Sequence, residues 1–569
     1  MLLSTIKKSK FNCLLLSFLI FLVVSSCYER KTIPKGVCVS QITKNYWSKD
    51  ITRVIDGLAK KHSFDSSIFS FIKTTGYTKS YALSYIKDST FREELFSLFD
   101  TLKDEGLPVE EVVFSFLNSL PDFSDTNLYI DPQLPVELDI ILSHAILSLK
   151  SWADWGMLDP SDFLSVYQSK RIKIVKSKNY LDSISELSIE KLFNTRKLSE
   201  RYLALKQEYK KLLENNSQIK RKNNLPFEYT LLKGSYDKRI PDIREKLREL
   251  GFTLNQDTST FFDTSLFRHI LNWQKVNGLV SDGKIGAETY EMLFLSSYDK
   301  LDKLKAAMER ERWLRQFKLG RRFVWVNLAS AQVNLLAADS SVSFKVCSGR
   351  RPDKKTDMRT PQLVSYVNFV QACPFWRVPQ SIAEKEIFPA VLKNPNYLKK
   401  NNYELVRGSE VVPDSVVKWR ELNPKKLPFI FRQKTGVKNS LGLVKFNIIN
   451  DKSIYMHDTP NKWAFRYPFR WVSHGCVRLE KPLEMARFLL ALNKEKDKKI
   501  TEIVYDEKKR TKSDTFGLDK PITIHMKKWI PVFFDYRTAR YDTDKHKITY
   551  SFDVYGYDEK LINDMNLIF

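Results

Sequence analysis

Two short stretches of this sequence decide how its fold and chemistry are interpreted. Residues 453–460 read Ser-Ile-Tyr-Met-His-Asp-Thr-Pro, and residues 471–479 read Trp-Val-Ser-His-Gly-Cys-Val-Arg-Leu. Side chains two residues apart lie on the same face of a β-strand. If both stretches form strands and the strands lie side by side, the imidazole of His457 is set against the thiol of Cys476.

The residue types on these two strand faces are those that thiol catalysis needs. A thiol is only about 3% ionised at neutral pH, so a nucleophilic cysteine requires an imidazole partner or a positive local field. Tyr455 shares the face of His457, and His474 and Arg478 share the face of Cys476. An isolated cysteine is usually a small buried hydrophobe, but the co-occurrence of these residues favours a catalytic thiol.

The region around these stretches is predicted to consist mainly of strands and loops, from about Phe323 to Tyr505. Strands are expected at Phe323–Leu328 and Val333–Leu336, and helices near Ile382–Leu392 and Pro482–Leu492. Residues from about 380 to 433 form a longer connection than two strands need, with a helix-like segment at Val411–Arg420. Such insertions are commonly lids or binding loops, and the alternative is an inert surface insertion.

A compact helical pattern precedes this region. Helices are expected at Ile240–Leu250 and Thr264–Val276, with a third from Ala287. The run Asp282-Gly283-Lys284-Ile285-Gly286 favours a turn, because glycine permits positive φ and Asp bonds its own backbone.

The flanking regions are predicted to form scaffold rather than to carry chemistry. The N-terminal part is predicted to be helical, with helices such as Phe91–Leu102 and Ile189–Leu213, and a charged helix is expected at Tyr298–Phe317. Near the C-terminus, Trp529–Tyr541 and Ile548–Val554 flank a polar turn, which predicts a hairpin that completes the catalytic sheet.

The first residues are typical of a secretory signal. Lys7, Lys8 and Lys10 precede an apolar run from Phe11 to Val24, which is followed by Ser-Ser-Cys27. Small residues before a cysteine resemble the bacterial lipobox, which implies cleavage before Cys27 and attachment of a lipid to its sulfur. An uncleaved anchor or a signal cleaved elsewhere is the alternative.

The remaining cysteines are too few for a disulfide scaffold. Cys13 would be lost with the signal and Cys27 would be lipidated, which leaves Cys38, Cys347, Cys373 and Cys476 in a chain of 569 residues. Their spacing offers no Cys/His set suited to zinc, so at least one is available for chemistry.

Composition excludes several classes of protein. The hydrophobic fraction of 43% and only 18 glycines exclude a disordered or collagen-like chain. The excess of 93 Lys and Arg over 67 Asp and Glu, 93 − 67 = +26, favours an anionic partner. An export signal argues against nucleic acid as that partner.

The site stretches resemble a known enzyme family. His457, followed by Ser-His-Gly-Cys-Val-Arg at 473–478, resembles the signature of the L,D-transpeptidases of the YkuD type. The helical pattern at 236–297, with Trp273-Gln274 and the Asp-Gly-x-Ile-Gly turn, resembles the peptidoglycan-binding module. Further segments resemble the large YcbB-like members: Arg312–Leu314, Trp325–Asn327, Ser348–Arg350, Asp357–Pro361, Cys373–Ile382, Arg432–Gly442 and Lys445-Phe446. Thr435 stands where many members have proline.

The resemblance implies a role for each matching residue. Cys476 is the expected nucleophile, His457 its general base and the backbone carbonyl of Asp458 the group that orients the imidazole, while N–H groups around Gly475 and Cys476 stabilise the oxyanion. The expected substrate pocket is lined by Tyr455, His474, Arg478, Ser473 and Trp376. Some members have serine at the position of His474, so it is expected to tune the pocket rather than to take the proton.

The expected fold class is multidomain α+β. Its expected parts are a signal (1–26), a helical scaffold (28–235), a three-helix peptidoglycan-binding domain (236–297), a linker helix (298–320), a mostly-β catalytic domain (321–506) with a capping insert (about 380–433), and a strand-rich extension (507–569).

The reaction that the resemblance implies is a 3→3 crosslink between peptidoglycan stem peptides through a thioester, without metal or cofactor. Two alternatives stay open: an L,D-carboxypeptidase or hydrolase of the same fold, and a non-catalytic peptidoglycan-binding lipoprotein. The expected partners are peptidoglycan stems and glycan strands and, through Cys27, a membrane of the cell envelope. The sequence does not identify protein partners or show whether Cys347 and Cys373 pair.

Overall fold

The computed structural model describes most of the chain beyond residue 80. The described residues are 81, 84–85, 88–109, 117, 120, 134–167, 189–194, 196–215, 228–254, 258–277, 279–317, 319–337, 340–352, 356–436, 438–493, 521–543 and 545–568. The expected signal segment, Cys27 and Cys38 lie outside them. The chain divides into two compact units, residues 1–96 with 113–145 and residues 97–112 with 146–569.

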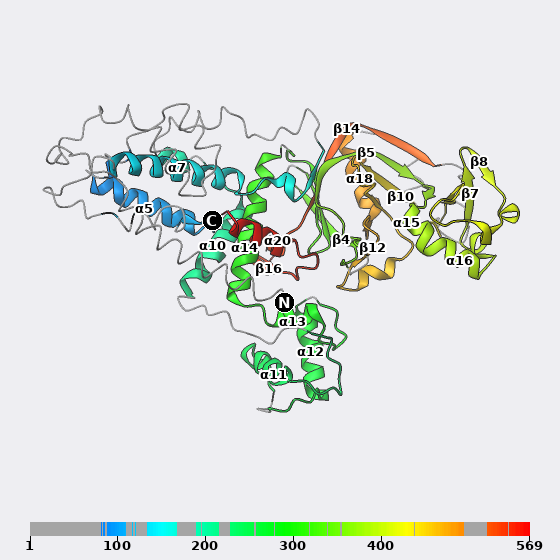
Figure 1. Ribbon diagram of the computed structural model, residues 1–569, viewed down its shortest axis with the longest axis horizontal. Helices are drawn as coiled ribbons and strands as arrows, with labels where there is room; N and C mark the ends of the chain where they lie inside the picture. The colour runs from blue at the N-terminus through cyan, green and yellow to red at the C-terminus, as the bar shows by residue number, and fades with distance from the viewer. Residues whose placement is uncertain are drawn as a thin grey trace, which may run out of the picture. The chain divides into compact units, whose positions relative to one another are not determined.

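A closed sheet forms the centre of the second unit (Figure 1). Its strand order is β1-β5-β10-β11-β13-β4-β3-β2-β14, and β14 also pairs with β5, which closes the sheet into a barrel. The strands are β1 (Ser165–Val166), β2 (Phe323–Asn327), β3 (Gln332–Leu336), β4 (Ser341–Gly349), β5 (Leu363–Ala372), β10 (Val444–Ile448), β11 (Tyr455–His457), β13 (Val477–Leu479) and β14 (Ile522–Asp535), with β12 (Trp471–Ser473) paired to β4. The strands predicted at Phe323–Leu328 and Val333–Leu336 are confirmed.

The barrel interior is packed with apolar side chains. Residues such as Val326, Val444 and Phe446 are fully buried there, and helix α18 (Pro482–Asn493) adds Leu489 to the same core. The helix predicted at Pro482–Leu492 is therefore confirmed. Cys347 and Cys373 are buried free thiols and do not pair.

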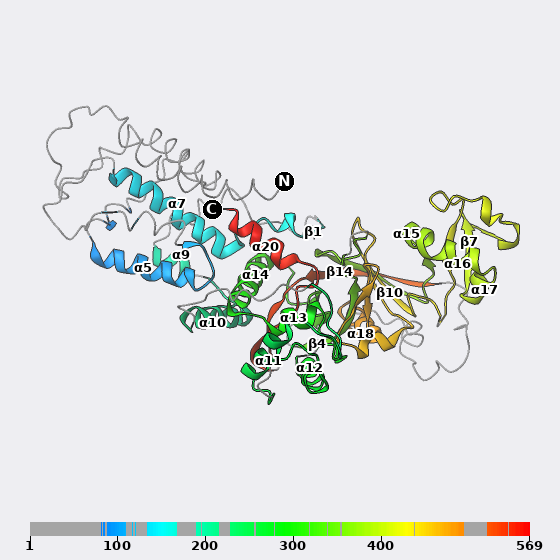
Figure 2. The same cartoon turned by 60° about the horizontal axis from the view of Figure 1, so that its bottom comes forward.

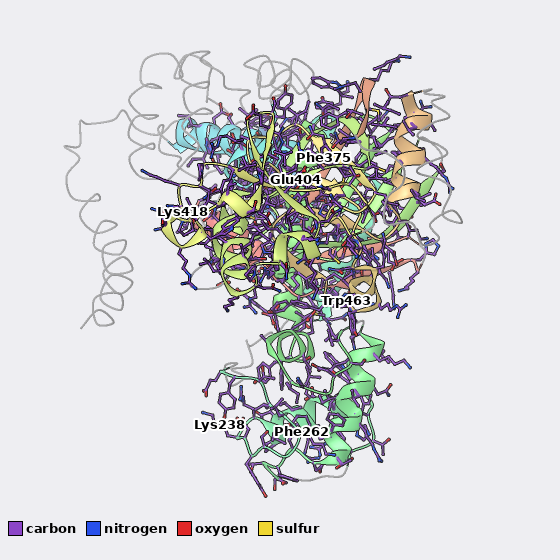
Figure 3. The ribbon with its side chains drawn as sticks, turned by 90° about the vertical axis from the view of Figure 1, so that its right-hand side faces the viewer. Lys238, Phe262, Phe375, Glu404, Lys418 and Trp463 are labelled. Carbon is purple, nitrogen blue, oxygen red and sulfur yellow. The ribbon has the colours of Figure 1, made fainter. Side chains whose placement is uncertain are left out.

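The insertion folds as a small subdomain with its own sheet and core (Figure 2). Its sheet order is β6-β9-β7-β8, with β6 (Trp376–Arg377), β7 (Tyr403–Arg407), β8 (Glu410–Val412) and β9 (Ile430–Gln433). Its helical segments are α15 (Gln380–Ile382), the π-helical turn η5 (Ala383–Ile387), α16 (Phe388–Lys393) and α17 (Tyr397–Lys400), so the helix predicted near Ile382–Leu392 is confirmed. In Figure 3, Phe375 and Glu404 mark the subdomain's near side, where Arg432 stacks on the Phe375 ring and bonds Glu404.

The helix predicted at Val411–Arg420 is wrong. Val411 and Val412 lie in β8, and only the short 3₁₀ turns Asp414–Val416 and Trp419–Glu421 follow. Two β-branched residues before Pro413 favour extended backbone, because proline excludes the α conformation at the residue before it.

Three helices form the module before the barrel. They are α11 (Ile240–Glu249), α12 (Thr264–Val276) and α13 (Ala287–Leu293), as predicted. The Gln274 side chain organises the glycine turn, because it accepts from the Gly283 N–H at 2.9 Å and donates to the Lys284 carbonyl at 2.8 Å. Phe262, labelled in Figure 3, is fully buried in the module core.

The N-terminal helices are α5 (Ser89–Lys103), α7 (Leu134–Trp155), α9 (Ile189–Asn194) and α10 (Glu200–Asn215). The helix at Phe91–Leu102 is confirmed, but the single helix predicted over Ile189–Leu213 is divided into α9 and α10. Ser199 starts the second helix, since its hydroxyl accepts from the Tyr202 N–H at 3.2 Å.

Helix α14 (Ser297–Gln316) confirms the predicted charged helix, and most of its side chains are buried. Its most deeply buried charges are paired within the second unit: Arg312 donates to Glu309, Arg537 to Glu311 and Arg310 to Asp558. Pairing makes this burial possible, because an isolated buried charge is far more costly than a hydrogen-bonded pair.

The C-terminal prediction is partly wrong. The strand that completes the barrel is β14, whereas β15 (Ala539–Asp542) and β16 (Lys547–Tyr550) form a separate two-stranded sheet. The chain then ends in an unpredicted helix, α20 (Tyr557–Asn566). The Asp553 side chain starts it by accepting from three successive N–H groups, those of residues 557–559.

Within the part of the chain that the structure describes, no helix is long and apolar enough to cross a membrane.

Candidate active site

The two site strands lie side by side at one end of the barrel. Strand β11 pairs in parallel with β13, with Met456 opposite Val477 and His457 opposite Arg478. Cys476 immediately precedes β13, so it lies beside Tyr455. The predicted adjacency of the strands is confirmed.

The Cys476 sulfur does not hydrogen-bond the imidazole in this structure. Its recorded neighbours are the Ser453 carbonyl oxygen at 3.8 Å and Tyr455, and no hydrogen bond joins it to His457 among the described residues. Burial raises the pKa of the Cys476 thiol, while hydrogen bonds from Tyr455 and the charges of Lys445 and Arg478 lower it. The resting group is therefore a protonated thiol. The nearby cations would stabilise the thiolate once the proton is removed.

His457 is a buried, neutral imidazole. Its Nδ1 lies 2.5 Å from the Asp458 carbonyl oxygen. In the neutral ring, an N–H at Nδ1 donates to this oxygen and leaves Nε2 as an acceptor. Burial and then the Arg478 charge lower the pKa of His457 to about 3. The imidazole is thus held in the form that accepts a proton.

Two cations border the thiol without a carboxylate partner. Arg478 forms no ion pair with a described residue, and its buried Nε has no hydrogen-bond partner. Lys445, on β10 opposite His457, has its Nζ 4.2 Å from the Tyr455 ring centroid and likewise lacks a described carboxylate. We call Lys445, Tyr455, His457, Cys476 and Arg478 the thiol site.

Sequence reasoning missed Lys445 as a site residue. It entered the resemblance only as part of Lys445-Phe446. A lysine between the apolar residues of 444–448 was nevertheless a signal that could have singled it out as a site residue. Its position on β10 places it beside β11, which only the sheet order reveals.

Hydrogen bonds hold the loop before Cys476. Gly475 has φ +119°, a conformation that favours glycine. The Thr360 hydroxyl donates to the Gly475 carbonyl at 2.6 Å, and Ser473 Oγ donates to the Cys476 carbonyl at 2.7 Å. Thr360 entered the sequence analysis only as part of the segment Asp357–Pro361, and its role in this loop was not predicted. Ser473, predicted to line the substrate pocket, is buried, and its hydroxyl bonds the loop backbone.

The Gly475 N–H is occupied in this arrangement. It donates to Ser473 Oγ at 3.1 Å. Of the two N–H groups predicted to stabilise an oxyanion, that of Gly475 is thus already used within the loop.

His474 connects this loop to the inserted subdomain. Its Nε2 lies 2.6 Å from Glu386 Oε1 in the π-helical turn and 2.8 Å from Arg350 Nη2. Single-turn π-helices often occur at functional sites. Neither partner of His474 was predicted.

Trp376, also predicted for the pocket, lies within hydrogen-bonding reach of the Tyr455 side chain. It belongs to β6 and so brings the insert to the thiol site. Burial raises the pKa of Tyr455, which keeps its hydroxyl protonated. The structure thus brings Tyr455, Trp376 and Arg478 together with the two predicted catalytic residues, whereas the His474 side chain contacts Glu386 and Arg350.

A cavity of about 1340 Å3 borders the loop at His474 and Gly475. Met358 and Arg359 line it, and β1 forms part of its wall. Among the described residues there is no group of three or more His, Cys, Asp or Glu side chains that could hold a metal ion.

Comparisons with known proteins agree with this architecture. Residues 321–515 match the L,D-transpeptidase catalytic domain of the YkuD type, and residues 237–293 match the "Putative peptidoglycan binding domain". A "Putative L,D-transpeptidase" of Haemophilus influenzae is 32% identical over 205 residues, which cover 36% of this chain and 38% of that relative.

A crystal structure of the L,D-transpeptidase from Xylanimonas cellulosilytica DSM 15894 is 14% identical, with 47% of this chain and 92% of that one covered. Its TM-score of 0.12 is too low to support a structural argument.

Proposed function

We propose that this chain, which carries an L,D-transpeptidase catalytic domain and a peptidoglycan-binding domain, uses Cys476 to crosslink peptidoglycan stem peptides. The observation that carries the proposal is the thiol at the start of β13, flanked by a neutral imidazole and two unpaired cations. Such a site suits attack on a peptide carbonyl, because thiol, base and cations are all present.

In the first step, Cys476 attacks the carbonyl carbon at the L-centre of the diamino acid in a tetrapeptide stem. His457 takes the thiol proton, the C–S bond forms, and the bond to the terminal D-Ala nitrogen breaks. D-Ala leaves as an amine that receives the proton from His457. A thioester to Cys476 remains.

In the second step, the side-chain amine of another stem attacks the thioester. The new amide C–N bond forms, the C–S bond breaks, and the amine proton returns to the sulfur through His457. The product is a 3→3 crosslink, and the enzyme is regenerated.

The charges around the thiol support the first step. Lys445 and Arg478 lower the pKa of Cys476 against the effect of burial, so they stabilise the thiolate. The same charges disfavour an imidazolium at His457, so the proton would stay on the ring only until the leaving amine accepts it. Because neither cation has a described carboxylate partner, each is also available to the carboxylate of the terminal D-Ala.

We assign oxyanion stabilisation to the Cys476 N–H, since the Gly475 N–H is already donated to Ser473. The inserted subdomain would cap the substrate, with His474 and Glu386 as its contact to the loop. The cavity beside His474 offers space for the second stem.

Peptidoglycan as substrate places the protein in the cell envelope. We further propose that the N-terminal segment is a lipoprotein signal and that Cys27 carries the lipid anchor. Mass spectrometry of protein isolated from membranes tests this proposal, since a diacylglyceryl-modified Cys27 at the mature N-terminus is expected, and an unmodified Cys27 would contradict it.

A hydrolase that releases D-Ala with water as acceptor is the second candidate, because the thiol site performs the same first step in both reactions. Two products distinguish them when the purified protein is incubated with tetrapeptide muropeptides. Dimers formed with loss of D-Ala support transpeptidation, whereas tripeptide monomers alone support hydrolysis. A product pattern identical for wild type and Cys476→Ala would refute both and favour a non-catalytic binding protein.

A carbapenem provides an independent test of the nucleophile. The lactam ring should acylate Cys476 and raise the protein mass by the mass of the drug, and Cys476→Ala should remain unmodified. Labelling of the variant as strongly as the wild type would exclude Cys476 as the acylated residue.

A further inference from the structure

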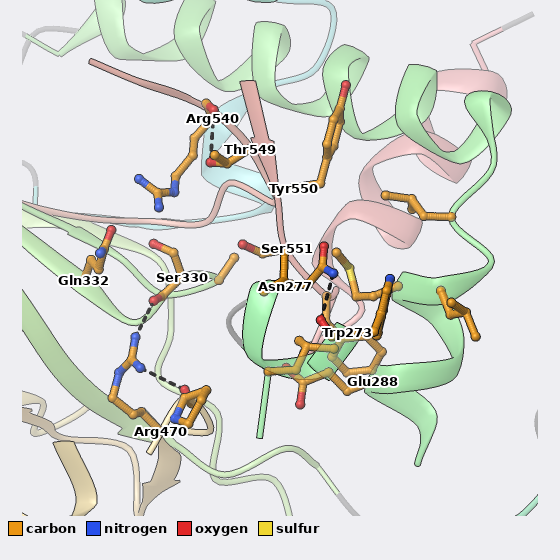
Figure 4. Close-up of a pocket in the computed structure, with 18 of the residues that line it drawn as sticks. Trp273, Asn277, Glu288, Ser330, Gln332, Arg470, Arg540, Thr549, Tyr550 and Ser551 are labelled. Atoms are coloured by element: carbon orange, nitrogen blue, oxygen red, sulfur yellow. Dashed lines mark hydrogen bonds between the residues drawn. The ribbon is translucent and has the colours of Figure 1, made fainter. Parts of the chain in front are cut away.

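A second cavity, which does not include Cys476, is formed by the helical module, the barrel and the C-terminal hairpin (Figure 4). Its volume is about 740 Å3, which is within the usual range for ligand pockets. Trp273 and Glu288 come from the module, Arg470 from the segment before β12, and Arg540 from the hairpin. We call it the basic cavity.

The described lining of the basic cavity carries eight Lys or Arg side chains and one carboxylate, Glu288. Burial, and then the neighbouring Glu291 carboxylate, raise the pKa of Glu288 to about 7, so its negative charge is only partly present at neutral pH. Six of the cations form no ion pair with a described carboxylate: Lys300, Lys345, Arg466, Arg470, Arg540 and Lys547. The cavity is therefore strongly positive.

Four polar atoms of the lining are buried without a hydrogen-bond partner: Ser330 Oγ, Arg470 Nε, Arg540 Nε and the Tyr550 hydroxyl. The other nitrogens of Arg470 donate to backbone carbonyls, including that of Ser330 at 2.9 Å. Buried donors are nearly always paired in proteins. Donors left unpaired in a positive cavity point to a ligand that supplies anionic acceptors.

The basic cavity is close to the thiol site along the chain. Arg470 directly precedes β12, and Cys476 follows six residues later. Six extended residues span at most about 20 Å. One polymer of repeating units is therefore able to reach both places.

We propose that the basic cavity binds carboxylate-bearing peptide stems of a peptidoglycan strand, as a second site separate from the one that reacts. This inference rests on the proposed function, because that function supplies the carboxylates. Guanidinium groups bind phosphate as well as carboxylate, so phosphate polymers are the competing source of the anion. Binding here would hold the strand while a stem reacts at Cys476.

The test measures co-sedimentation of the purified full chain with insoluble peptidoglycan. The double variant Arg540→Gln/Lys547→Gln removes two cations of the cavity. The matched control Lys197→Gln/Lys211→Gln removes two exposed lysines, one between α9 and α10 and one on α10. We expect at least about tenfold weaker binding for the cavity variant, as for the loss of charge-assisted hydrogen bonds, and unchanged binding for the control. Arg540→Lys should retain most of the affinity, and unchanged circular dichroism would show that the variants fold.

Two further arms identify the anion. In the first, the carboxylates of peptidoglycan are amidated, and the wild type should bind this material about as weakly as the cavity variant binds native peptidoglycan. In the second, polyphosphate competes for the wild type and should displace native peptidoglycan poorly. Equal binding of the two peptidoglycans, or efficient displacement by polyphosphate, would overturn the assignment to stem carboxylates. Wild-type affinity in the cavity variant would overturn the site itself.

Turnover of a soluble disaccharide-tetrapeptide separates this inference from the proposed function. The cavity variant should retain wild-type kcat/KM on this small substrate, and a loss of turnover equal to the loss of binding would contradict a separate site. Absence of turnover by the wild type, with carboxylate-dependent binding intact, would refute only the proposed reaction.

Discussion

The thiol site and the basic cavity share their electrostatics but not their chemistry. Each contains buried arginine nitrogens without partners, Arg478 Nε in the first and Arg470 and Arg540 Nε in the second. The thiol site adds a cysteine and a neutral imidazole, whereas the described lining of the basic cavity has neither. Unpaired cations therefore indicate where an anion binds, and only the thiol with its base indicates where a bond is broken.

The largest difference between the thiol site and the basic cavity is expected for the variant Cys476→Ala. Removal of the nucleophile should lower crosslinking by at least about 10⁴-fold and leave sedimentation with peptidoglycan unchanged. Rates measured with muropeptides and the sedimentation assay check both parts. Cys373→Ala is the control, because this buried thiol lies outside the thiol site. Equal loss of binding and rate would show that the regions are not independent.

His457→Gln should lower kcat/KM by roughly 10²–10⁴-fold, as for loss of a general base. Since the pKa of His457 is lowered to about 3, the wild-type pH profile of kcat/KM should show no inflection near 6.5 from this group. The module residue His269→Gln serves as control. A clear acid limb between pH 6 and 7 that disappears in His457→Gln would contradict the assigned effect of burial.

The same lowered pKa affects stability, and its sign follows from proton binding. Between about pH 6.5 and pH 3 the unfolded chain protonates this histidine while the folded chain does not. The contribution of His457 to stability is thus fully present above about pH 6.5 and is lost as the pH falls toward 3.

Lys445→Met should lower kcat/KM by about 10–100-fold, because the thiolate and the substrate carboxylate lose a neighbouring cation. The pKa of Cys476, measured by the pH dependence of its alkylation, should rise in the same variant. Lys481→Met, an exposed lysine just after β13, is the matched control. An unchanged thiol pKa would exclude Lys445 from this role and leave Arg478 as the relevant cation.

The smallest effect is expected at the contact between the loop and the insert. Glu386→Gln weakens a half-exposed pair with His474, which is worth at most about 1 kcal/mol, so KM should rise by about 2–5-fold with kcat nearly unchanged. Glu384→Gln in the same turn should have no effect. Faster hydrogen exchange at 383–387 in Glu386→Gln would link the change to the insert, and a fall in kcat alone would contradict it.

Much of the architecture could be predicted from local patterns. Helices α11 and α12 and strand β3 follow apolar periodicity that is already visible in the sequence, strand β2 follows a short apolar run, and α14 follows a long run of charged residues. Periodicity failed at Val411–Val412, where β-branched residues before a proline pair with β7, and at the hairpin of β15 and β16, whose partner strands it could not identify. Pairing across the chain is set by tertiary contacts that a local pattern does not contain.

The sequence by itself determined which groups are available for chemistry: one cysteine with two histidines and an arginine, spaced by two along strands. Only the tertiary structure decided their states. Burial keeps His457 neutral, and the sheet order brings Lys445 beside Tyr455. The Gly475 N–H donates to Ser473 Oγ, so these two residues stabilise the loop that contains them. Desolvation and proximity depend on what surrounds a residue in space, so pKa values and unpaired cations emerge only when distant segments pack together.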